Sequence, residues 1–362
     1  MTDRTERTRF FADLGWGVFT HYIHPQGGVY PPSMRSRHQT FSSWEERIAF
    51  FNTDTYAATL HDVGAHYAVF TLMQGSRYMI APNETFDRIT GCKPGEACAK
   101  RDLVKDLIAS LKKYDIPLFL YFTGDGPCRD EKCGKAMGWF DKDSLDMEPC
   151  FVSNWTSVLK EYALRYGRDV KGFWFDGMYD FSGYTEEKIK QYRDAALSGN
   201  PDAVVAFNNG VSQPKIRDKS VEKYTLGKNN AQAVKSLFEA AKTDPVALQA
   251  LTYRPGKTVR YSEYEDFTAG EDDDFIELPP EGGMVDGSRW HTLCFLGQYE
   301  QYSPIWGGSG WNCLGARHSG AYMKEYVKTC NQRGGVVSID CYLFDDGSFD
   351  EGQMEVLRAI EK

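Results

Sequence analysis

The sequence predicts an α/β fold, a (β/α)8 TIM-like barrel. Short β-branched or aromatic runs alternate with amphipathic segments of helical period, and seven or eight such units fit into 362 residues. Strands separated by single helices build βαβ units and therefore a parallel sheet. Neither G-x-G-x-x-G nor G-x4-G-K-[ST] follows a strand, so the fingerprints of nucleotide-binding open sheets are missing from the sequence. We expect a single domain over 1–362, with an insertion around 211–257.

The predicted strands are runs rich in β-branched and aromatic residues, which favour the extended conformation. In chain order they lie at 15–22, 67–72, 117–123, 171–177, 203–210, 258–267 and 334–343. The predicted helices have apolar residues at helical spacing, as at Leu103, Leu107 and Leu111. They lie at 102–114, 154–167, 185–197, 230–242, 319–330 and 350–361. Helices between the strands would cover the outside of the barrel.

Charge and composition exclude several classes of protein. The chain has 42 Lys and Arg against 51 Asp and Glu, a net charge of −9, which argues against a nucleic-acid partner. No run approaches ~18 apolar residues, so no membrane partner is expected. The N-terminus lacks the apolar core of a signal peptide, which predicts a cytoplasmic protein unless an export signal has been removed. Nine cysteines, an odd number, favour free thiols. Assembly into a homo-oligomer stays open.

Polar residues at the ends of the predicted strands are candidates for the functional site. In a (β/α)8 barrel the catalytic groups stand at the carboxyl ends of the strands, where the βα loops share one mouth. In strand order, these candidates are His21, Gln74, Thr123, Asp125, Asp176, Asn208, Asn209, Glu263, Glu265, Asp266 and Glu271.

Asp176 is the strongest candidate, because it directly follows the apolar run Phe173-Trp174-Phe175. A carboxylate in such a place is costly unless it has partners or a function. The alternative is an Asp that caps the turn after the strand. Glycosidic cleavage needs a second carboxyl group, and the acidic segment 262–283 offers several. Such a segment is more often a solvated surface, but its interleaved aromatic residues indicate that part of it turns inward.

Segments spread over most of the chain carry a resemblance to a known family. FWFDG at 173–177 resembles the strand that bears the nucleophile of glycoside hydrolase family 29, the retaining α-L-fucosidases. EDFTAGE at 265–271 resembles the family's Asp-Phe-x-x-x-Glu, whose Glu is the acid/base in some members. Similar matches follow the same order at 11–22, 51–71, 101–123, 306–311 and 327–361. The resemblance implies the barrel, without the C-terminal β-sandwich usual in the family.

The resemblance also implies roles for individual residues. Asp176 would be the nucleophile and Glu271 the acid/base. Glu263, Glu265 and Glu277 are the alternatives for the acid/base. His21 would bind sugar hydroxyls, while Trp174, Trp311 and Tyr22 would form aromatic walls around the sugar.

Several positions depart from the family pattern. The family's K-H-H-D-G-F reads Met73-Gln74-Gly75-Ser76-Arg77-Tyr78, and its V-N-x-R reads Phe207-Asn208-Asn209-Gly210. A Glu-Trp pair becomes Thr55-Tyr56, and a Trp-Glu becomes Trp290-His291. Because these positions contact the sugar hydroxyls in the family, the departures put fucose itself in question. The residues now expected to bind substrate there are Gln74, Arg77, Asn208 and His291. Arg77 could pair with an acidic sugar or, alternatively, be solvated.

The predicted function is a retaining, exo-acting glycoside hydrolase that cleaves terminal α-L-fucose or a related sugar by double displacement. The substrate would be an oligosaccharide or glycoconjugate, and no metal or other cofactor is expected. One alternative is a glycosidase of the same fold that acts on a different glycone, either acidic or L-galacto- or arabino-like. The other is a carbohydrate-binding barrel without catalysis.

Overall fold

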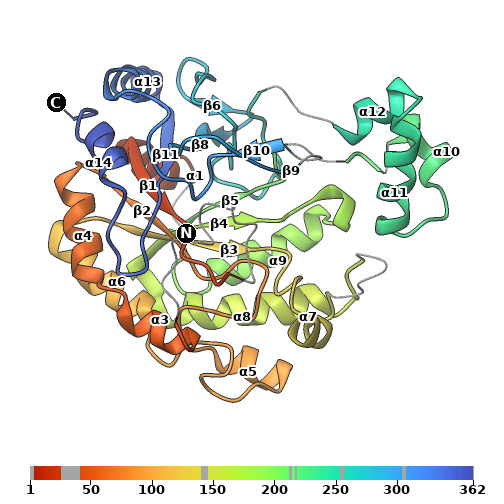
Figure 1. Ribbon diagram of the computed structural model, residues 1–362, viewed down its shortest axis with the longest axis horizontal. Helices are drawn as coiled ribbons and strands as arrows, with labels where there is room; N and C mark the ends of the chain where they lie inside the picture. The colour runs from red at the N-terminus through yellow and green to blue at the C-terminus, as the bar shows by residue number, and fades with distance from the viewer. Residues whose placement is uncertain are drawn as a thin grey trace.

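The computed structural model describes residues 4–25, 41–139, 146–211, 214–216, 218–252, 257–303 and 307–361. Seven parallel strands form the central sheet, in the order β5-β4-β3-β2-β1-β11-β8. Their bounds are β1 Trp16–Thr20, β2 Ala68–Thr71, β3 Leu118–Thr123, β4 Val170–Asp176, β5 Val204–Phe207, β8 His291–Phe295 and β11 Val336–Asp340. Figure 1 shows these strands at the centre of the molecule, with helices around them.

An irregular segment, 266–271, closes the sheet between β5 and β8. On one side, the amide of Asp266 donates to Val205 O at 2.8 Å. On the other side, Phe267 and Glu271 make parallel bridges with Arg289 and Leu293. The segment therefore takes the place of the eighth strand, and the (β/α)8 barrel is confirmed.

Gly270 allows this closure. Its φ is +60°, and a Cβ atom there would lie 1.7 Å from the carbonyl oxygen of His291. No other residue type tolerates both the left-handed backbone and so close an approach.

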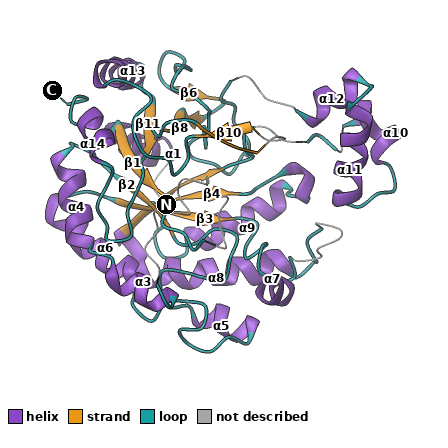
Figure 2. Cartoon of the chain, viewed as in Figure 1, coloured by secondary structure: helices purple, strands orange, loops and turns teal. Residues whose placement is uncertain are grey.

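The helices cover the outside of the barrel, as Figure 2 shows. The helices of the barrel are α1 Arg4–Leu14, α3 Trp44–Phe50, α4 Thr53–Asp62, α5 Glu84–Thr90, α6 Leu103–Leu111, α7 Glu131–Met137, α8 Phe151–Tyr166, α9 Glu186–Ala196, α13 Gly320–Gln332 and α14 Glu351–Leu357. Side-chain caps begin many of them. For example, Asp102 accepts from the amide of Lys105 at the start of α6. The large apolar cluster between these helices and the strands forms the main core.

A second apolar cluster fills the inside of the barrel, and α1 closes its amino end. Phe11 of α1 packs against Tyr67, Phe119, Phe267 and His291, with ring centroids 4.3–5.7 Å apart. All four partners lie near the starts of their strands. The interior is therefore solid at this end, and only the carboxyl end is left for a site.

Three helices between β5 and the closing segment stand apart from the barrel. They are α10 Glu222–Thr225, α11 Asn230–Ala241 and α12 Pro245–Leu251, at the right of Figure 1. We call them the arm. They enclose an apolar cluster of their own, which includes Val221, Leu237 and Leu251. Short hairpins of β6 Met284–Val285 with β7 Ser288–Arg289, and of β9 Glu300–Ser303 with β10 Gly307–Ser309, complete the structure.

Six of the seven predicted strands match observed ones, and one is wrong. The strand expected at 258–267 is a loop over most of that range, and the closing segment begins only at Asp266. The sequence reading also missed β8, whose five residues include His291 and Thr292 and lack a clear alternation. Among the described residues, no helix is long and apolar enough to cross a membrane.

Candidate active site

Two carboxyl groups at the carboxyl end of the barrel share one amide group. The Nδ2 atom of Asn208 donates to Asp176 Oδ1 at 2.8 Å and to Glu271 Oε2 at 2.6 Å. Asp176 is the last residue of β4, Asn208 follows β5, and Glu271 ends the closing segment. The site is thus built from three neighbouring positions of the barrel wall.

The two-residue period of the strands explains why these side chains meet. Tyr121 of β3 is paired with Trp174 of β4, which is paired with Ala206 of β5, and all three side chains fill the barrel interior. Two residues further along the chain from Trp174 and Ala206, the side chains of Asp176 and Asn208 therefore also point inward. The layer above the apolar interior is therefore polar.

Tyr121 supports the carboxylate of Asp176 from below. Its hydroxyl donates to Asp176 Oδ2 at 2.6 Å, so each carboxylate oxygen of Asp176 has a donor. Burial and the nearby charge of Asp176 raise the pKa of Tyr121, which keeps its proton on the phenol. Trp174 stacks on Tyr121 with centroids 5.6 Å apart, and its Nε1 donates to Ala269 O at 3.1 Å.

Glu271 lies in an environment that disfavours its charge. Burial and, secondly, the charge of Asp176 raise its pKa to about 8, although the bond from Asn208 opposes the shift. A carboxyl group with such a pKa is protonated at neutral pH and can serve as a general acid. Tyr179 is buried near the same carboxyl groups. Burial and the charges of Asp176, Asp125 and Glu271 raise its pKa.

His21 and Trp311 form a second part of the mouth. His21 Nδ1 lies 2.7 Å from Oδ1 of Asp340, the last residue of β11. The ring of His21 is 5.6 Å from Trp311 and 5.7 Å from Tyr121, in both cases edge to face. The rings of His21 and Trp311 thus lie on the same side of the mouth as Tyr121, which donates to Asp176 Oδ2.

Tyr22 does not reach the site, and its prediction as an aromatic wall is wrong. It is 1% exposed, and its hydroxyl donates to the backbone carbonyls of Arg47 and Asp345. Adjacent residues of an extended chain point to opposite faces. Since His21 faces the barrel mouth, Tyr22 faces the helices, and this could have been read from the sequence.

His291 is also placed away from the site. It begins β8, so it lies at the amino end of the barrel, where it is 1% exposed. Its Nδ1 contacts the carbonyls of Thr268 and Ala269, and its Nε2 lies 2.8 Å from Ser338 Oγ. Burial lowers its pKa to about 4, which leaves the ring neutral. The expected contact with substrate is wrong, because that prediction lacked the strand that begins at this residue.

Arg77 forms an ion pair with another residue of the chain. Its guanidinium binds both carboxylate oxygens of Asp130, with Nη2–Oδ1 at 3.0 Å and Nε–Oδ2 at 2.5 Å. Its side chain is 22% exposed, and its contact with substrate stays a prediction. Gln74 lies half-buried in the same loop after β2, and its role in binding stays a prediction.

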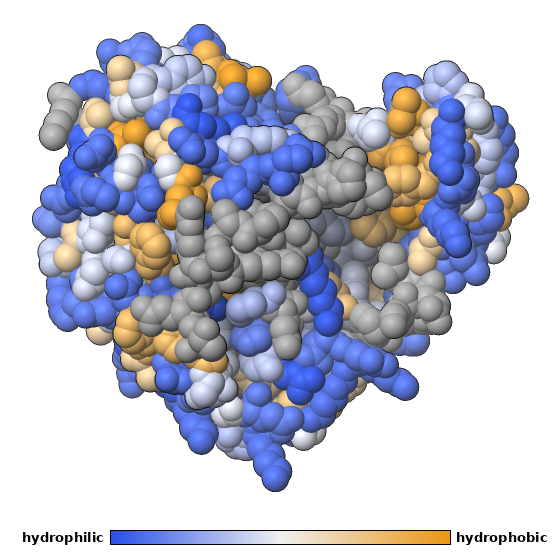
Figure 3. All heavy atoms as spheres, viewed as in Figure 1, coloured by the Kyte–Doolittle hydropathy of each residue, from blue (hydrophilic) through white to orange (hydrophobic). Residues whose placement is uncertain are grey.

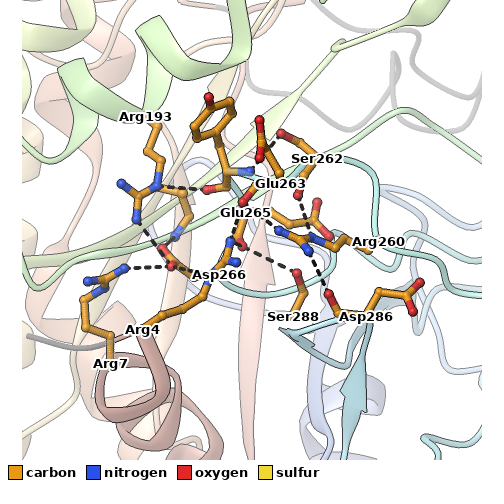
Figure 4. Close-up of polar contacts among 12 residues, drawn as sticks. Arg4, Arg7, Arg193, Arg260, Ser262, Glu263, Glu265, Asp266, Asp286 and Ser288 are labelled. Atoms are coloured by element: carbon orange, nitrogen blue, oxygen red, sulfur yellow. Dashed lines mark hydrogen bonds and ion pairs between the residues drawn. The ribbon is translucent and has the colours of Figure 1, made fainter. Parts of the chain in front are cut away.

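The alternatives for the acid/base lie elsewhere. Figure 4 shows Glu263 and Glu265 beside a cluster in which Arg4, Arg7 and Arg193 point at Asp266, with N–O distances of 3.0–3.6 Å. This cluster joins α1 and α9 to the start of the closing segment, at the amino end of the barrel. Glu277 lines the same cavity as Glu271, but its carboxylate accepts from the amide and hydroxyl of Thr258 at 2.7–2.8 Å. Among these residues, only Glu271 shares a donor with Asp176.

The sequence reading missed three residues of the site. Tyr121 and Asp340 lie within predicted strands, and the two-residue period would have assigned both to the inner face. Tyr179 follows the turn after β4 and gave no signal. Asp125 was only a strand-end candidate; burial raises its pKa, and it accepts from Thr123 Oγ1 and Cys128 Sγ.

A cavity of about 520 Å³ opens beside Glu271 and Asn208, a size typical of small-molecule sites. Residues on either side of the arm contribute to its wall, including Lys215 and Lys257. Gly210, which stands where the family pattern has Arg, leaves this wall without a side chain. In the described part of the chain, no three His, Cys, Asp or Glu side chains are grouped as a metal ion would require.

The fold and the site define a (β/α)8 barrel with a pair of carboxyl groups at its mouth, the architecture of many glycoside hydrolases. The family model for α-L-fucosidase matches residues 26–264, about two-thirds of the sequence. The chain therefore belongs to the α-L-fucosidase family. A search of curated proteins found no match.

Solved structures share the fold at low sequence identity. An endo-fucoidan hydrolase, MfFcnA4 of glycoside hydrolase family 107, superimposes with a TM-score of 0.62 at 12% identity, covering 99% of this chain and 54% of its own. An α-L-fucosidase from Bacteroides thetaiotaomicron gives 0.57 at 13% identity, covering 99% and 73%. The α-L-fucosidase AlfC from Lactobacillus casei, bound to α-L-fucose, gives 0.56 at 14% identity, covering 98% and 97%. The chain thus spans about half of the fucoidan hydrolase and nearly all of AlfC.

Proposed function

We propose that this protein is a retaining, exo-acting glycoside hydrolase that removes terminal α-L-fucose from an oligosaccharide or glycoconjugate. Asp176 is the nucleophile and Glu271 the acid/base in this proposal. The observation that carries it is the single amide group of Asn208, which binds both carboxyl groups. Membership of the α-L-fucosidase family supports the choice of fucose.

The separation of the two carboxyl groups supports retention. Two oxygens that lie 2.8 and 2.6 Å from one nitrogen are at most about 5.4 Å apart, which is shorter than the separation in inverting enzymes and compatible with the about 5–5.5 Å of retaining enzymes. Inverting enzymes need about 6.5–9.5 Å, to leave room for a water molecule. The shared donor leaves no such room between these two oxygens.

The reaction follows from the states of the two groups. A carboxylate oxygen of Asp176 attacks the anomeric carbon, the glycosidic bond breaks, and Glu271 gives its proton to the leaving oxygen. The products of this step are a glycosyl ester of Asp176, a carboxylate at Glu271 and the free leaving group. Glu271 then takes a proton from water as the water oxygen attacks the same carbon, which releases the sugar and restores both groups. Asn208 and Tyr121 hold the nucleophile throughout.

Hydrolysis of 4-nitrophenyl α-L-fucoside by the wild type and by Asp176→Ala tests the proposal. We expect turnover by the wild type and a loss of at least ~10³-fold in the variant, about 4 kcal/mol of barrier. NMR spectra taken early in the reaction should show α-L-fucose before its β anomer. If β-L-fucose forms first, retention is wrong. Equal turnover by the variant would remove Asp176 from the mechanism.

The same reaction on another glycone is the second candidate. It is favoured by Gly210, which leaves the mouth without the arginine of the family pattern. A panel of aryl glycosides that includes α-L-galactoside and β-L-arabinopyranoside would separate the two candidates. L-Fucose that raises the melting temperature without any turnover would instead point to a binding protein.

A further inference from the structure

A third carboxyl group, that of Asp125, stands at the mouth of the barrel close to Asp176. Tyr121 of β3 points into the barrel interior, so Thr123, two residues further along the strand, also points inward. Thr123 is paired with Asp176 of β4, and its hydroxyl donates to Oδ1 of Asp125. Because this donor lies on the inner face of the wall, the carboxyl group of Asp125 lies over the barrel interior.

The turn after β4 packs directly against this carboxyl group. A Cβ atom at Gly177 would lie 3.0 Å from Cγ of Asp125 and 3.1 Å from its Oδ1. On the same side, the amide of Gly124 donates to the backbone oxygen of Asp176 at 2.5 Å. The backbone at Gly177 has a φ of +70°, which favours glycine as much as the close approach does. Asp125 is therefore held next to the residue that follows Asp176.

The protein satisfies only part of the carboxyl group of Asp125. Besides the bond from Thr123, its Oδ2 accepts from the thiol of Cys128 at 3.1 Å, and a thiol is a weak donor. Among the described residues no cation forms an ion pair with Asp125, although the charge of Arg129 favours its ionised form. A carboxylate has about four acceptor sites. Since the residue is only half-buried, the remaining sites are open to a ligand.

Tyr179 indicates that Asp125 faces the same space as the other two carboxyl groups. Burial and the charges of Asp176, Asp125 and Glu271 raise its pKa, so its hydroxyl lies in the field of all three groups and keeps its proton. The half-buried ring stacks on Phe181 with centroids 5.2 Å apart. Within the described part of the chain, its hydroxyl donates to none of the three carboxyl groups. The space among them is thus bordered by Tyr179 and not filled by it.

The two sides of the scissile bond can be told apart. A general acid contacts the leaving oxygen, so in the proposed mechanism the leaving group lies on the side of Glu271. Glu271 lines the cavity at the base of the arm, which Figure 3 shows set off from the body of the molecule. Asp125 is not among the described residues that line this cavity, and its neighbours Thr123 and Gly177 lie on the side of Asp176. The part of the substrate nearest to Asp125 is therefore the terminal sugar.

We propose that Asp125 is a specificity-determining residue that accepts a hydrogen bond from one hydroxyl group of the terminal sugar. The inference rests on the proposed function for the orientation of the substrate. A site built to bind a hydroxyl group rejects the sugar that lacks it, because the buried acceptor is then left without a donor. Asp125 thus selects among sugars that differ at a single hydroxyl group.

Binding of free sugars tests the inference separately from hydrolysis. L-Fucose and its 2-, 3- and 4-deoxy analogues would be titrated into the wild type, Asp125→Ala and Asp125→Asn, and followed by saturation-transfer NMR. In the wild type, removal of the recognised hydroxyl group should weaken binding about tenfold or more. In Asp125→Ala, L-fucose itself should bind more weakly by that factor, and removal of the same hydroxyl group should have no further effect. Asp125→Asn keeps an acceptor oxygen and should recover part of the preference.

Asp194→Ala is the matched control, because it removes an exposed carboxylate of α9, and it should leave all four affinities unchanged. Melting temperatures establish that each variant is folded, and if Asp125→Ala is not, the reduced preference of Asp125→Asn decides. Wild-type protein that does not bind L-fucose, or that binds all four sugars equally, would overturn the inference. An unchanged preference in the folded variants would do the same. Loss of the preference in the variants, together with no hydrolysis of 4-nitrophenyl α-L-fucoside by the wild type, would support the contact with Asp125 and refute the proposed reaction.

Discussion

The imidazole of His21 and the carboxylate of Asp340 form a hydrogen bond of 2.7 Å that joins the ends of two adjacent strands, β1 and β11. Asp340 is 1% exposed, and burial raises its pKa, while His21 opposes the shift. Because the bond occupies Nδ1, it fixes which ring nitrogen of His21 is available to substrate.

The hydrogen bond between His21 and Asp340 predicts that Asp340 positions the ring of His21. Asp340→Ala should raise KM for the aryl fucoside by about tenfold, the effect of one lost hydrogen bond, with a smaller change in kcat. Asp340→Asn keeps an acceptor for Nδ1 and should recover most of the affinity. Steady-state kinetics of both variants, with their melting temperatures, would check this. Equal defects in the two variants would show that charge, rather than orientation, matters.

The raised pKa of Glu271 predicts an alkaline limit to activity. The protonated form is the general acid, so kcat/KM should fall as pH rises through about 8. Asn208→Ala removes the donor that stabilises the carboxylate of Glu271. The pKa of Glu271 should then rise further, which would move the alkaline limb to higher pH, while kcat falls roughly 10²-fold because Asp176 also loses a donor. A pH–rate profile from pH 4 to 10 measures both effects.

Glu265 provides a matched control for that pH dependence. Burial raises its pKa to about 8 as well, and its Oε2 has no hydrogen-bond partner among the residues that the structure describes, but it lies at the amino end of the barrel. A folded-state pKa above the unfolded value means that the contribution to stability is complete below pH ~4.5 and is lost as pH rises through about 8. Glu265→Gln should therefore raise the melting temperature at pH 9 relative to the wild type. The pH–rate profile should not move; a shift would reopen Glu265 as the acid.

The arginine cluster around Asp266 predicts a large loss of stability without a direct effect on catalysis. Asp266→Asn leaves three guanidinium groups without their buried carboxylate and should cost about 3–5 kcal/mol of unfolding free energy. Urea denaturation measures this loss. Asp286→Asn, at an exposed carboxylate near the same end of the barrel, is the control and should change stability little.

Two cysteines predict a specific response to oxidation. The Sγ atoms of Cys92 and Cys133 lie 3.7 Å apart, and both residues are buried. With glutathione disulfide as oxidant, the two thiols should form one disulfide and release two molecules of glutathione. The cross-link should stabilise the protein by about 2–4 kcal/mol. Peptide mapping without reduction would identify the bond; a link between Cys92 and Cys98, neighbours in sequence, would contradict the structure.

The sequence predicted the barrel, and the place of Asp176 at its mouth, better than the rest of the site. Asp176 was predictable because an acidic residue ended a strongly apolar run, and strand ends converge in a barrel. The predictions for Tyr22 and His291 were wrong because they used proximity in sequence. They did not consider that Tyr22 faces the helices or that His291 begins a strand. The partner of Arg77 could not be predicted, since Asp130 reaches it from the loop after another strand. The closing segment could not be predicted either. It is held by isolated β-bridges and side-chain contacts, and not by the regular strand pairing that an alternating sequence pattern indicates.

The closing segment has a consequence for how this barrel can change. Asp176, the proposed nucleophile, stands on β4, which is paired with β3 and β5. Glu271 ends an irregular segment that is bonded to β5 through Asp266 and to the other side of the barrel at isolated bridges. Residues can be inserted or removed before that segment, as the arm illustrates, without disturbing the ladder that bears Asp176. In the proposed mechanism, the group that attacks the terminal sugar thus stands on a regular strand, and the group that protonates the leaving oxygen stands on an irregular segment.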